Sequence, residues 1–333
     1  MNNFGSILKK ELKDLKKELD PFIYRALKKH GDELFHDLNI YQLKTGGKRL
    51  RPFILLSIYE LLGGEEKPLN EAAAIEIFHN YSLLLDDIID KGTIRRGEAT
   101  MWRKFGLSAT LCSSSFYFST ITDLLKYSSK EAVDLFVKET KQVMEGEFID
   151  VLQERASSNK EAPDDLIESY GKVDYDGYLK MIKKKTAALF RASCGMGAVL
   201  AGRKKDLPIK FGNFLGISYQ LRDDILDIFG NPDTFGKEKG KDIKEKKGGN
   251  IVLIYAIEEN PEIKYFFSKN NHIGDKEVDE IISAIKKTKA KRRTQDLIGE
   301  YTQKALKILD RLPAEKSKKK MENLVRYFQM RRK

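Results

Sequence analysis

The sequence predicts an all-α protein, and three observations support that prediction. Apolar residues recur at three- and four-residue spacing, the helical period, through most of the 333 residues. Strand-like alternation between turn residues is almost absent. The composition, with 41% hydrophobic residues, 24 glycines and 8 prolines, excludes a disordered or collagen-like chain. The two cysteines, Cys112 and Cys194, lie too far apart to indicate a disulfide framework or a zinc motif.

The expected helices are the stretches in which apolar residues keep the helical spacing. Helices are expected over 6–30, 43–63, 70–91, 107–126, 130–156, 176–202, 208–230, 248–259, 277–290, 296–311 and 315–331. The prolines fall near the expected helix ends, from Pro21 to Pro313. Polar segments at 157–165 and 231–249 are expected to be surface loops, and the length of the second indicates a functional loop. Because no Gly-, Ser- or Pro-rich linker divides the chain, residues 1–333 are predicted to form a single-domain antiparallel helical bundle.

The charge of the chain points to an anionic partner. Lys and Arg number 61 and Asp and Glu number 50, a formal net charge of +11. Nucleic acid, a membrane surface and a phosphorylated small molecule all fit such a surplus. No apolar run approaches the ~20 residues that a membrane span needs. The N-terminus is charged and amphipathic, unlike a secretory signal, so a soluble, cytoplasmic protein is expected.

Two matched aspartate clusters are the most specific feature of the sequence. Residues 86–90 read Asp-Asp-Ile-Ile-Asp and residues 223–227 read Asp-Asp-Ile-Leu-Asp, each in an apolar, helix-forming stretch. On a helix the first and last aspartates share one face, so their carboxylates repel each other unless a cation compensates. One acidic triplet is usually a solvated surface, but two matched triplets on apolar helices favour a cation site. Oxygen ligands without His or Cys favour Mg²⁺, which typically binds carboxylates together with substrate phosphates.

Basic residues occur beside both clusters, where the remaining phosphate oxygens would need partners. Residues 46–52 read Gly-Gly-Lys-Arg-Leu-Arg-Pro and open an expected helix, whose N-terminus also attracts anions. Arg95 and Arg96 follow the first cluster. The planar guanidinium of arginine is suited to bidentate contacts with phosphate, and lysine supplies a point charge. His79 lies two turns before Asp86 and could donate to a phosphate oxygen. The further candidates are Lys185, Lys237 and Lys247.

Together these motifs resemble those of the trans-isoprenyl diphosphate synthases, the polyprenyl synthetase family. The matching segments are GGKRLRP, DDIID followed by RRG, KTAALF, Gln220 with DDILD, and FGKEKGKDIKEKK. They occur in the family's order and spacing, and with the flanking helices the resemblance covers nearly the whole chain. DDxxD alone would be a weak signal, because terpene cyclases share it. The resemblance implies an isoprenoid-synthase bundle around a deep central cavity, usually assembled as a homodimer.

The resemblance also implies a prenyltransferase reaction. Isopentenyl diphosphate would be condensed head to tail with an allylic diphosphate, which ionises to a carbocation with the help of three Mg²⁺ ions. Pyrophosphate would take the proton that is then lost, so no strongly basic side chain is needed.

Residue roles follow from the same resemblance. Asp86, Asp90 and Asp223 would be direct metal ligands, with Asp87, Asp224 and Asp227 as further ligands or ligands through water. The allylic diphosphate would be held by Arg95, Lys185, Lys237 and Lys247, and isopentenyl diphosphate by Lys48, Arg51, His79 and Arg96. Thr186 and Gln220 would face the cation with neutral oxygens.

The product length is expected to be set just before the first cluster. Tyr81 and Ser82 lie there, and five residues of helix rise only ~7.5 Å, which would stop growth after a few isoprene units. Helix geometry alone directs Ser82 along the Asp86 face, so the choice of Tyr81 as the floor rests on the resemblance to archaeal-type geranylgeranyl synthases. A C15–C20 product is predicted, with C20 favoured. The alternative is that Phe116 or Phe118 sets the limit.

Other functions remain open at this point. A terpene cyclase of related fold would need only one substrate site, and GGKRLRP with the complete second cluster argues against it. The family's usual residues are replaced at Leu85, Ser114, Ser115, Glu147 and Lys246, which bears on helix packing and the dimer contact rather than on the chemistry. A catalytically inactive subunit that needs a partner is a second alternative. The basic runs 283–293 and 315–333 could bind nucleic acid or an acidic membrane, but they lack interleaved aromatic residues. Diphosphates are therefore the expected anions, and nucleic acid is not an expected partner.

Overall fold

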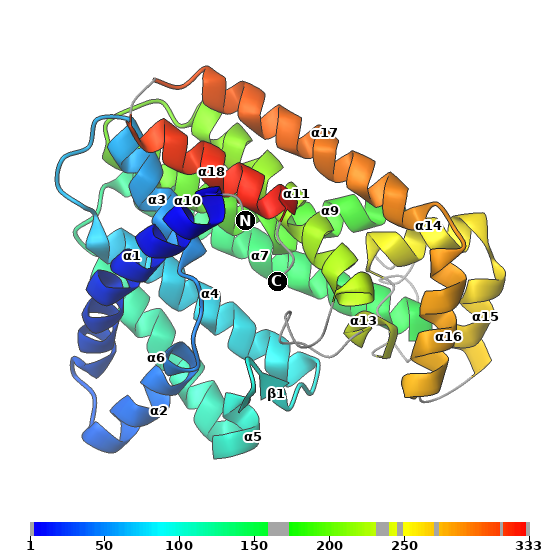
Figure 1. Cartoon of the computed structure of the whole chain (residues 1–333). Coiled ribbons are helices and arrows are strands. Elements are labelled where there is room, and N and C mark those ends of the chain that lie inside the picture. Colours follow the sequence, from blue (N-terminus) through cyan, green and yellow to red (C-terminus); the bar gives the residue numbers. More distant parts are fainter. Residues whose placement is uncertain are drawn as a thin grey trace. The chain divides into compact units, whose positions relative to one another are not determined.

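The computed structural model describes residues 3–158, 173–230, 240–244, 249–269, 273–313 and 316–330. Helices make up nearly all of the regular structure in these ranges, which confirms the all-α prediction (Figure 1). The chain forms two compact units, of which unit 1 comprises residues 1–141, 189–213 and 305–327 and unit 2 comprises residues 142–188, 214–304 and 328–333. The expectation of one domain over 1–333 stays a prediction. None of the helices in the described ranges is both long and apolar enough to cross a membrane.

Unit 1 is built around α4. Its elements are α1 (Asn3–Lys28), α2 (Glu33–Lys44), α3 (Leu50–Leu61), α4 (Leu69–Ile89), β1 (Ile94–Arg95), β2 (Glu98–Ala99), α5 (Met101–Phe105), α6 (Leu107–Leu125), the first part of α7 (Lys130–Ser158), most of α10 (Ala187–Leu200), the start of α11 (Asp206–Phe229), the end of α17 (Ala290–Asp310) and most of α18 (Lys316–Met330). Residues 71–78 of α4 are all buried, so this helix is covered on every side, by α6, α3 and α1 among others. A helix that is buried on all sides lies in a hydrophobic core. The first aspartate cluster therefore lies at the end of a helix that the core holds in place.

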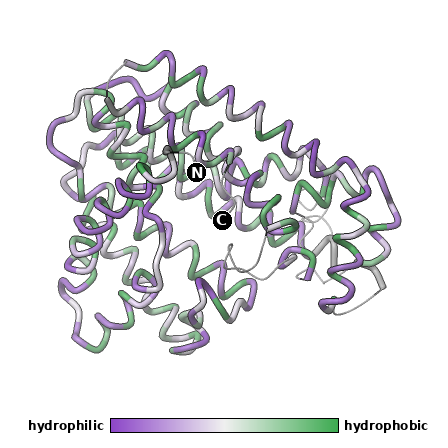
Figure 2. Tube along the Cα trace, in the orientation of Figure 1, coloured by the Kyte–Doolittle hydropathy of each residue, from purple (hydrophilic) through white to green (hydrophobic). Residues whose placement is uncertain are grey.

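Unit 2 is built around the second half of α11. Its other elements are the rest of α7, α9 (Tyr175–Lys185), α13 (Lys241–Lys244), α14 (Ile251–Glu259), α15 (Glu262–Lys269), α16 (Asp275–Lys286) and the first part of α17. Ile217, Leu221, Ile225 and Ile228 of α11 are buried at helical spacing in the core of this unit. Figure 2 shows the same amphipathic pattern as interleaved hydrophobic and hydrophilic residues along the helices. The second aspartate cluster lies among these buried positions.

The expected helices are found with several differences, and α5, α15 and nearly all of α2 lie in stretches for which the sequence predicted no helix. The helix expected from residue 43 begins at Leu50 instead, as α3, because α2 ends at Lys44 and the chain turns at Gly46 and Gly47, whose φ angles are 122° and 118°. The helix expected over 176–202 is broken at Thr186 into α9 and α10. Pro21 lies inside α1 rather than at a helix end. A short antiparallel hairpin, β1–β2, occupies 94–99.

The two predicted loops lie mostly outside the described residues. Residues 159–165 and 231–239 are not described, and neither are residues 245–248. The described part of the second segment contains the short helix α13, which the sequence did not predict.

Candidate active site

The first aspartate cluster lies at the C-terminal end of α4, where its carboxylates meet Arg95. Asp86 and Asp87 belong to the last turn, and Asp90 is the C-cap residue. Arg95 donates through Nε to both oxygens of Asp87 at 2.8 Å and through Nη2 to Asp86 Oδ2 at 2.8 Å. The side chain of Asp87 is 3% exposed and that of Asp86 is 20% exposed. Asp87 is therefore engaged inside the protein, whereas Asp86 still faces solvent.

The β1–β2 hairpin explains why Arg95 turns back onto α4. Arg95 pairs with Glu98, which leaves a two-residue turn of Arg96 and Gly97. Both turn residues have positive φ, 56° and 83°, as a type I′ hairpin turn requires. The hairpin is braced at its base, because the Trp102 indole donates to the carbonyl oxygen of Gly92 at 2.8 Å. The motif RRG is thus a turn that aims two arginines in different directions.

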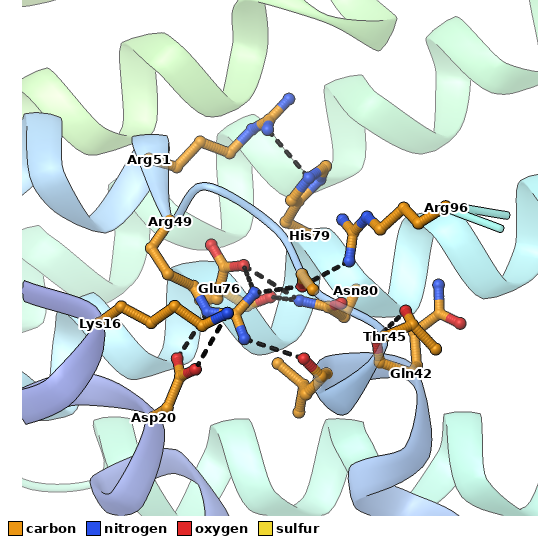
Figure 3. Close-up of polar contacts among 12 residues, drawn as sticks. Lys16, Asp20, Gln42, Thr45, Arg49, Arg51, Glu76, His79, Asn80 and Arg96 are labelled. Atoms are coloured by element: carbon orange, nitrogen blue, oxygen red, sulfur yellow. Dashed lines mark hydrogen bonds and ion pairs between the residues drawn. The ribbon is translucent and has the colours of Figure 1, made fainter. Parts of the chain in front are cut away.

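Arg49 is the centre of a buried ionic network beneath the Gly46–Gly47 turn (Figure 3). Its guanidinium donates to Asp20 at 2.7 Å and to Glu76 at 3.1 Å, and also to the carbonyl oxygens of Gly46 and Leu43. The side chain is 0% exposed. Two carboxylates and two carbonyl oxygens therefore surround this cation, which places it in the structure of the turn and away from solvent.

Gly46 connects that network to a neighbouring cation. Its carbonyl oxygen accepts from Arg96 Nη1 at 2.5 Å as well as from Arg49, so one carbonyl anchors two arginines (Figure 3). A Cβ at Gly47 would lie 2.5 Å from Arg49 Nη1 and 3.2 Å from both terminal nitrogens of Arg96. Glycine at this position is therefore required by both its positive φ and this close approach.

Arg51 and His79 form a second contact in the same unit. Arg51 Nη1 lies 3.0 Å from His79 Nε2, and the guanidinium lies over the ring of Phe190. Because arginine can only donate, Nε2 must accept, which puts the imidazole proton on Nδ1. Loss of solvent, followed by the charges of Arg51, Arg96, Arg95 and Arg49, holds the pKa of His79 well below its usual range. His79 is thus a neutral acceptor toward Arg51, not the Nε2 donor that would bind phosphate directly.

Lys48 is an exposed candidate anion ligand, as Arg96 is. Its Nζ lies 3.2 Å from the hydroxyl of Tyr327 on α18 and 5.6 Å from the centroid of that ring. The turn therefore presents one cation to α18 while its neighbour, Arg49, is buried.

In unit 2, Lys185 and Thr186 lie at the break between α9 and α10. A Cβ at Gly146 of α7 would lie 2.1 Å from the backbone nitrogen of Lys185, so glycine lets α7 pass directly against the break. Lys185 Nζ contacts Glu147 at 2.8 Å and Asp150 at 2.7 Å, both on α7. The candidate diphosphate ligand Lys185 is thus balanced by two carboxylates, one of which, Glu147, is a departure from the family pattern.

In the second cluster, Asp224 and Asp227 are buried and Asp223 is half-buried. Asp224 is 2% exposed, and it accepts from the Tyr178 hydroxyl at 2.7 Å, from Ile251 N at 3.0 Å and from Gln220 Nε2 at 2.9 Å. Burial, followed by the charge of Asp242, raises the pKa of Asp224 to about 7, against the effect of these hydrogen bonds. Asp227 Oδ2 accepts from the backbone nitrogen of Asp242 at 3.3 Å.

Sequence reasoning missed three of these residues. Tyr178, Arg49 and Glu76 are buried polar groups with internal partners. A charged residue in an otherwise apolar helical stretch is a signal that could have found Glu76, whereas Arg49 and Tyr178 stand in polar stretches that give no such signal. Two predicted ligands, Lys237 and Lys247, lie outside the described residues. The structure groups Arg51, His79, Asp86, Asp87, Arg95 and Arg96 in unit 1, and Lys185, Thr186, Gln220 and Asp224 in unit 2.

The donor chemistry of both clusters fits Mg²⁺. Asp86, Asp90, Asp223 and Asp227 supply only carboxylate oxygens, the ligands that Mg²⁺ prefers. Among the residues that the structure describes, no three His, Cys, Asp or Glu side chains converge as a protein-only metal site.

The structure is that of an all-α protein with two carboxylate clusters and an arginine-lined turn. Comparison with known proteins identifies the family to which such a chain belongs. The polyprenyl synthetase family model matches residues 32–288. The chain is 31% identical over 320 residues to a geranylgeranyl pyrophosphate synthase of Geoglobus acetivorans, covering 91% of this chain and 93% of that protein. It is 29% identical over 334 residues to heptaprenyl diphosphate synthase component 2 of Geobacillus stearothermophilus, covering 97% and 96%.

Solved structures agree. The geranylgeranyl pyrophosphate synthetase of Pyrococcus horikoshii matches with a TM-score of 0.85 at 26% identity, covering 98% of this chain and 99% of that chain. The protein therefore belongs to the polyprenyl synthetase family, which confirms the resemblance drawn from the motifs.

Proposed function

We propose that this protein is a cytoplasmic trans-prenyltransferase that condenses isopentenyl diphosphate with allylic diphosphates in successive 1′-4 head-to-tail steps. The observation that carries the proposal is the contact of two arginines with the C-terminal half of α4. Arg51 Nη1 lies 3.0 Å from His79 Nε2, and Arg95 donates to the carboxylates of Asp86 and Asp87 about two turns further along the helix. Cations and carboxylates in one place suit a ligand that carries both phosphate charge and bound metal.

The chain's own residues divide the work between the two diphosphates. Lys48, Arg51 and Arg96 are proposed to bind isopentenyl diphosphate. His79 is proposed to orient Arg51 by accepting a hydrogen bond from it at Nε2. Arg95 and Lys185, with Lys237 and Lys247, are proposed to bind the allylic diphosphate. Both described members of this set are held against carboxylates, Arg95 by Asp86 and Asp87 and Lys185 by Glu147 and Asp150. Each charge is thereby held in place within its own unit, as a group that stabilises a departing diphosphate needs to be.

The proposed metal ligands are Asp86, Asp90, Asp223 and Asp227. Asp87 and Asp224 are left out of the ligand set, because their carboxylates are engaged by Arg95 in one case and by Tyr178, Ile251 and Gln220 in the other. Mg²⁺, in the number of three expected for the family, would neutralise the diphosphate and assist its departure. Thr186 and Gln220 would then turn oxygens toward the allylic cation.

The preferred product is a C20 prenyl diphosphate, within a C15–C20 range. Tyr81 and Phe118 meet edge to face with ring centroids 4.5 Å apart, and Phe78 contacts both rings. Phe116 instead packs against Phe35. Ser82 donates its hydroxyl to the carbonyl oxygen of His79. Of the two phenylalanines weighed as alternatives to Tyr81, only Phe118 touches it, so the proposed floor is a Tyr81–Phe118 pair.

Replacing Tyr81 by alanine should lengthen the product by one or more isoprene units. The variant removes one ring of the proposed floor, and Tyr81→Ala combined with Phe118→Ala should lengthen the product further because the supporting ring is also lost. Phe116→Ala is the matched control and should leave the length unchanged. Reversed-phase analysis of dephosphorylated products gives the lengths. A Tyr81→Ala product of wild-type length would remove Tyr81 from the floor.

The proposed homodimer has a candidate surface on α6. Leu107 and Leu111 lie one turn apart and are 50% and 45% exposed, and Phe118 is 43% exposed. Apolar side chains gathered on one helix face are typical of an interface. Sedimentation of the assayed sample reports the state: a dimer supports the proposal and a monomer contradicts it.

Incubation with Mg²⁺, labelled isopentenyl diphosphate and separate C5, C10 and C15 allylic primers tests the function. Linear prenyl diphosphates of defined length are the expected products, and EDTA should abolish them. A cyclised hydrocarbon made from one substrate alone would favour the terpene cyclase alternative. One relative is named as a component of a heptaprenyl diphosphate synthase, so failure to elongate any primer would instead favour an inactive subunit.

A further inference from the structure

Four hydrogen bonds within unit 2 form a network in which Gln220 joins the buried Asp224 to Thr186. Tyr178 and the backbone nitrogen of Ile251 both donate to Asp224 Oδ2, at 2.7 and 3.0 Å. Gln220 Nε2 donates to Asp224 Oδ1 at 2.9 Å. The Thr186 hydroxyl donates to Gln220 Oε1 at 2.8 Å. The network runs from the core of the unit to the break between α9 and α10.

The carboxylate gives this network a direction. An ionised carboxylate only accepts hydrogen bonds, so the amide nitrogen of Gln220 must face Asp224 and the amide oxygen must face Thr186. Thr186 donates its single hydroxyl proton to that oxygen. Toward any other group, the Thr186 hydroxyl can therefore act only through its oxygen lone pairs. An uncharged group in place of Asp224 would not impose this order.

We propose that Asp224 is a positioning residue that sets the polarity of Gln220 and Thr186, so that these two groups present oxygen rather than hydrogen to a developing cation. The inference rests on the proposed function, since the benefit of outward oxygens arises only where positive charge appears. It assigns the central aspartate of the second cluster a role in orientation, acting through two neutral side chains.

The surroundings of Asp224 support orientation over metal binding. The residue is 2% exposed and its two oxygens accept three protein hydrogen bonds. Its donors come from three helices, α9, α11 and the first residue of α14, so the carboxylate is fixed in position. The half-buried Asp223, beside it in sequence, is more accessible to an ion.

Asp224→Asn should reverse the polarity while keeping the shape. Tyr178 and Ile251 both donate, so the new amide must turn its oxygen to them and its nitrogen to residue 220. Gln220 then has to flip, and it presents its nitrogen to Thr186. We expect kcat to fall about a hundredfold, the scale for losing one preorganised group at a developing charge, with the KM of both diphosphates and the half-saturating Mg²⁺ within about twofold of wild type.

The reciprocal double variant should restore the polarity. In D224N/Q220E the carboxylate stands at position 220, where it accepts from the new amide and from Thr186. Q220E alone places two carboxylates against each other, so it should be at least as impaired as D224N. We expect the double variant to recover at least about tenfold in kcat over either single variant, a coupling that independent sites do not show.

Tyr117→Phe is the matched control. Tyr117 is a buried tyrosine of unit 1 whose hydroxyl donates to the carbonyl oxygen of Asn39, so this variant loses a buried hydrogen bond outside the network. It should lower the melting temperature and leave kcat unchanged.

The outcomes separate the two proposals. If wild type elongates no primer, the proposed function fails, and the same cycle measured as melting temperatures still tests the network: a double variant more stable than both single variants supports it. If wild type is active but the double variant is no better than D224N, the inference is overturned. A raised Mg²⁺ requirement in D224N that Q220E leaves uncorrected would overturn it too, in favour of Asp224 as a metal ligand.

Discussion

Asp86→Asn is expected to lower kcat about a thousandfold and to raise the Mg²⁺ concentration needed for half-maximal rate. The substitution keeps the shape of the side chain but removes the negative charge, and a neutral amide oxygen is a much weaker ligand for a hard divalent ion. Folding should be retained, because the Asp86 side chain is 20% exposed and Arg95 keeps its bidentate contact with Asp87. Initial rates over a Mg²⁺ titration, with circular dichroism as the check on folding, measure the effect.

Asp123→Asn is the matched control for charge removal in the same unit. Asp123 lies on α6 and pairs at the surface with Lys29 and Lys126. Its replacement should leave both kcat and the Mg²⁺ requirement unchanged. A rate for Asp86→Asn within about threefold of wild type would show that Asp86 is not a ligand, since losing a charged metal ligand costs several kcal/mol of transition-state stabilisation.

The regular part of the fold was predictable because burial follows the helical period. The apolar spacing of α4 and α6 gives their ends within a residue or two of those expected, at 69–89 and 107–125. The turn at Gly46 and Gly47 was not predicted, because apolar spacing continues across it and only the backbone angles end the helix. The break at Thr186 was missed for the same reason: 176–202 reads as one helix, and the close approach of Gly146 on α7 is a tertiary effect.

The residues of the candidate site could be predicted from the sequence, but the role of each residue could not. Both aspartate clusters and the arginines around His79 could be found from residue type and spacing. Spacing does not tell which member of a DDxxD triplet turns inward, because the outcome depends on partners far away in sequence. Asp224 is fixed by Tyr178 and Ile251, and Asp87 by an arginine that a hairpin returns to it. The short hairpin itself lacks the alternation that predicts strands.

Arg49 is the sharpest example of this limit. In the sequence it stands between Lys48 and Arg51, and nothing in a run of basic residues marks one of them as internal. The structure buries it completely, between Asp20 of α1 and Glu76 of α4. Its φ of 54° lies in the left-handed region, an unusual conformation for a side chain of this size. The network of contacts holds that conformation in place.

Replacing Arg49 by methionine should therefore lower the free energy of unfolding by about 3–5 kcal/mol, the range for breaking a buried ion pair by removing one partner. The volume is roughly kept, so the loss comes from Asp20 and Glu76, which stay buried without their cation, and from the carbonyl oxygens of Gly46 and Leu43, which lose a donor. Urea unfolding followed by circular dichroism at 222 nm measures the change.

Two comparisons identify the cause. Arg293→Met removes a half-exposed arginine that pairs with Glu258 at 3.0 Å, and it should cost less than about 1 kcal/mol because surface pairs contribute little. Adding Asp20→Asn and Glu76→Gln to Arg49→Met removes the two carboxylates that have lost Arg49, of which Asp20 still pairs with Lys16 at 3.8 Å, and it should restore part of the lost stability even though the hydrogen bonds to the turn are not rebuilt. If the triple variant is less stable than Arg49→Met alone, uncompensated charge is not the reason for the loss. The cost would then lie in the turn itself, whose Gly46 carbonyl would depend on Arg96 alone.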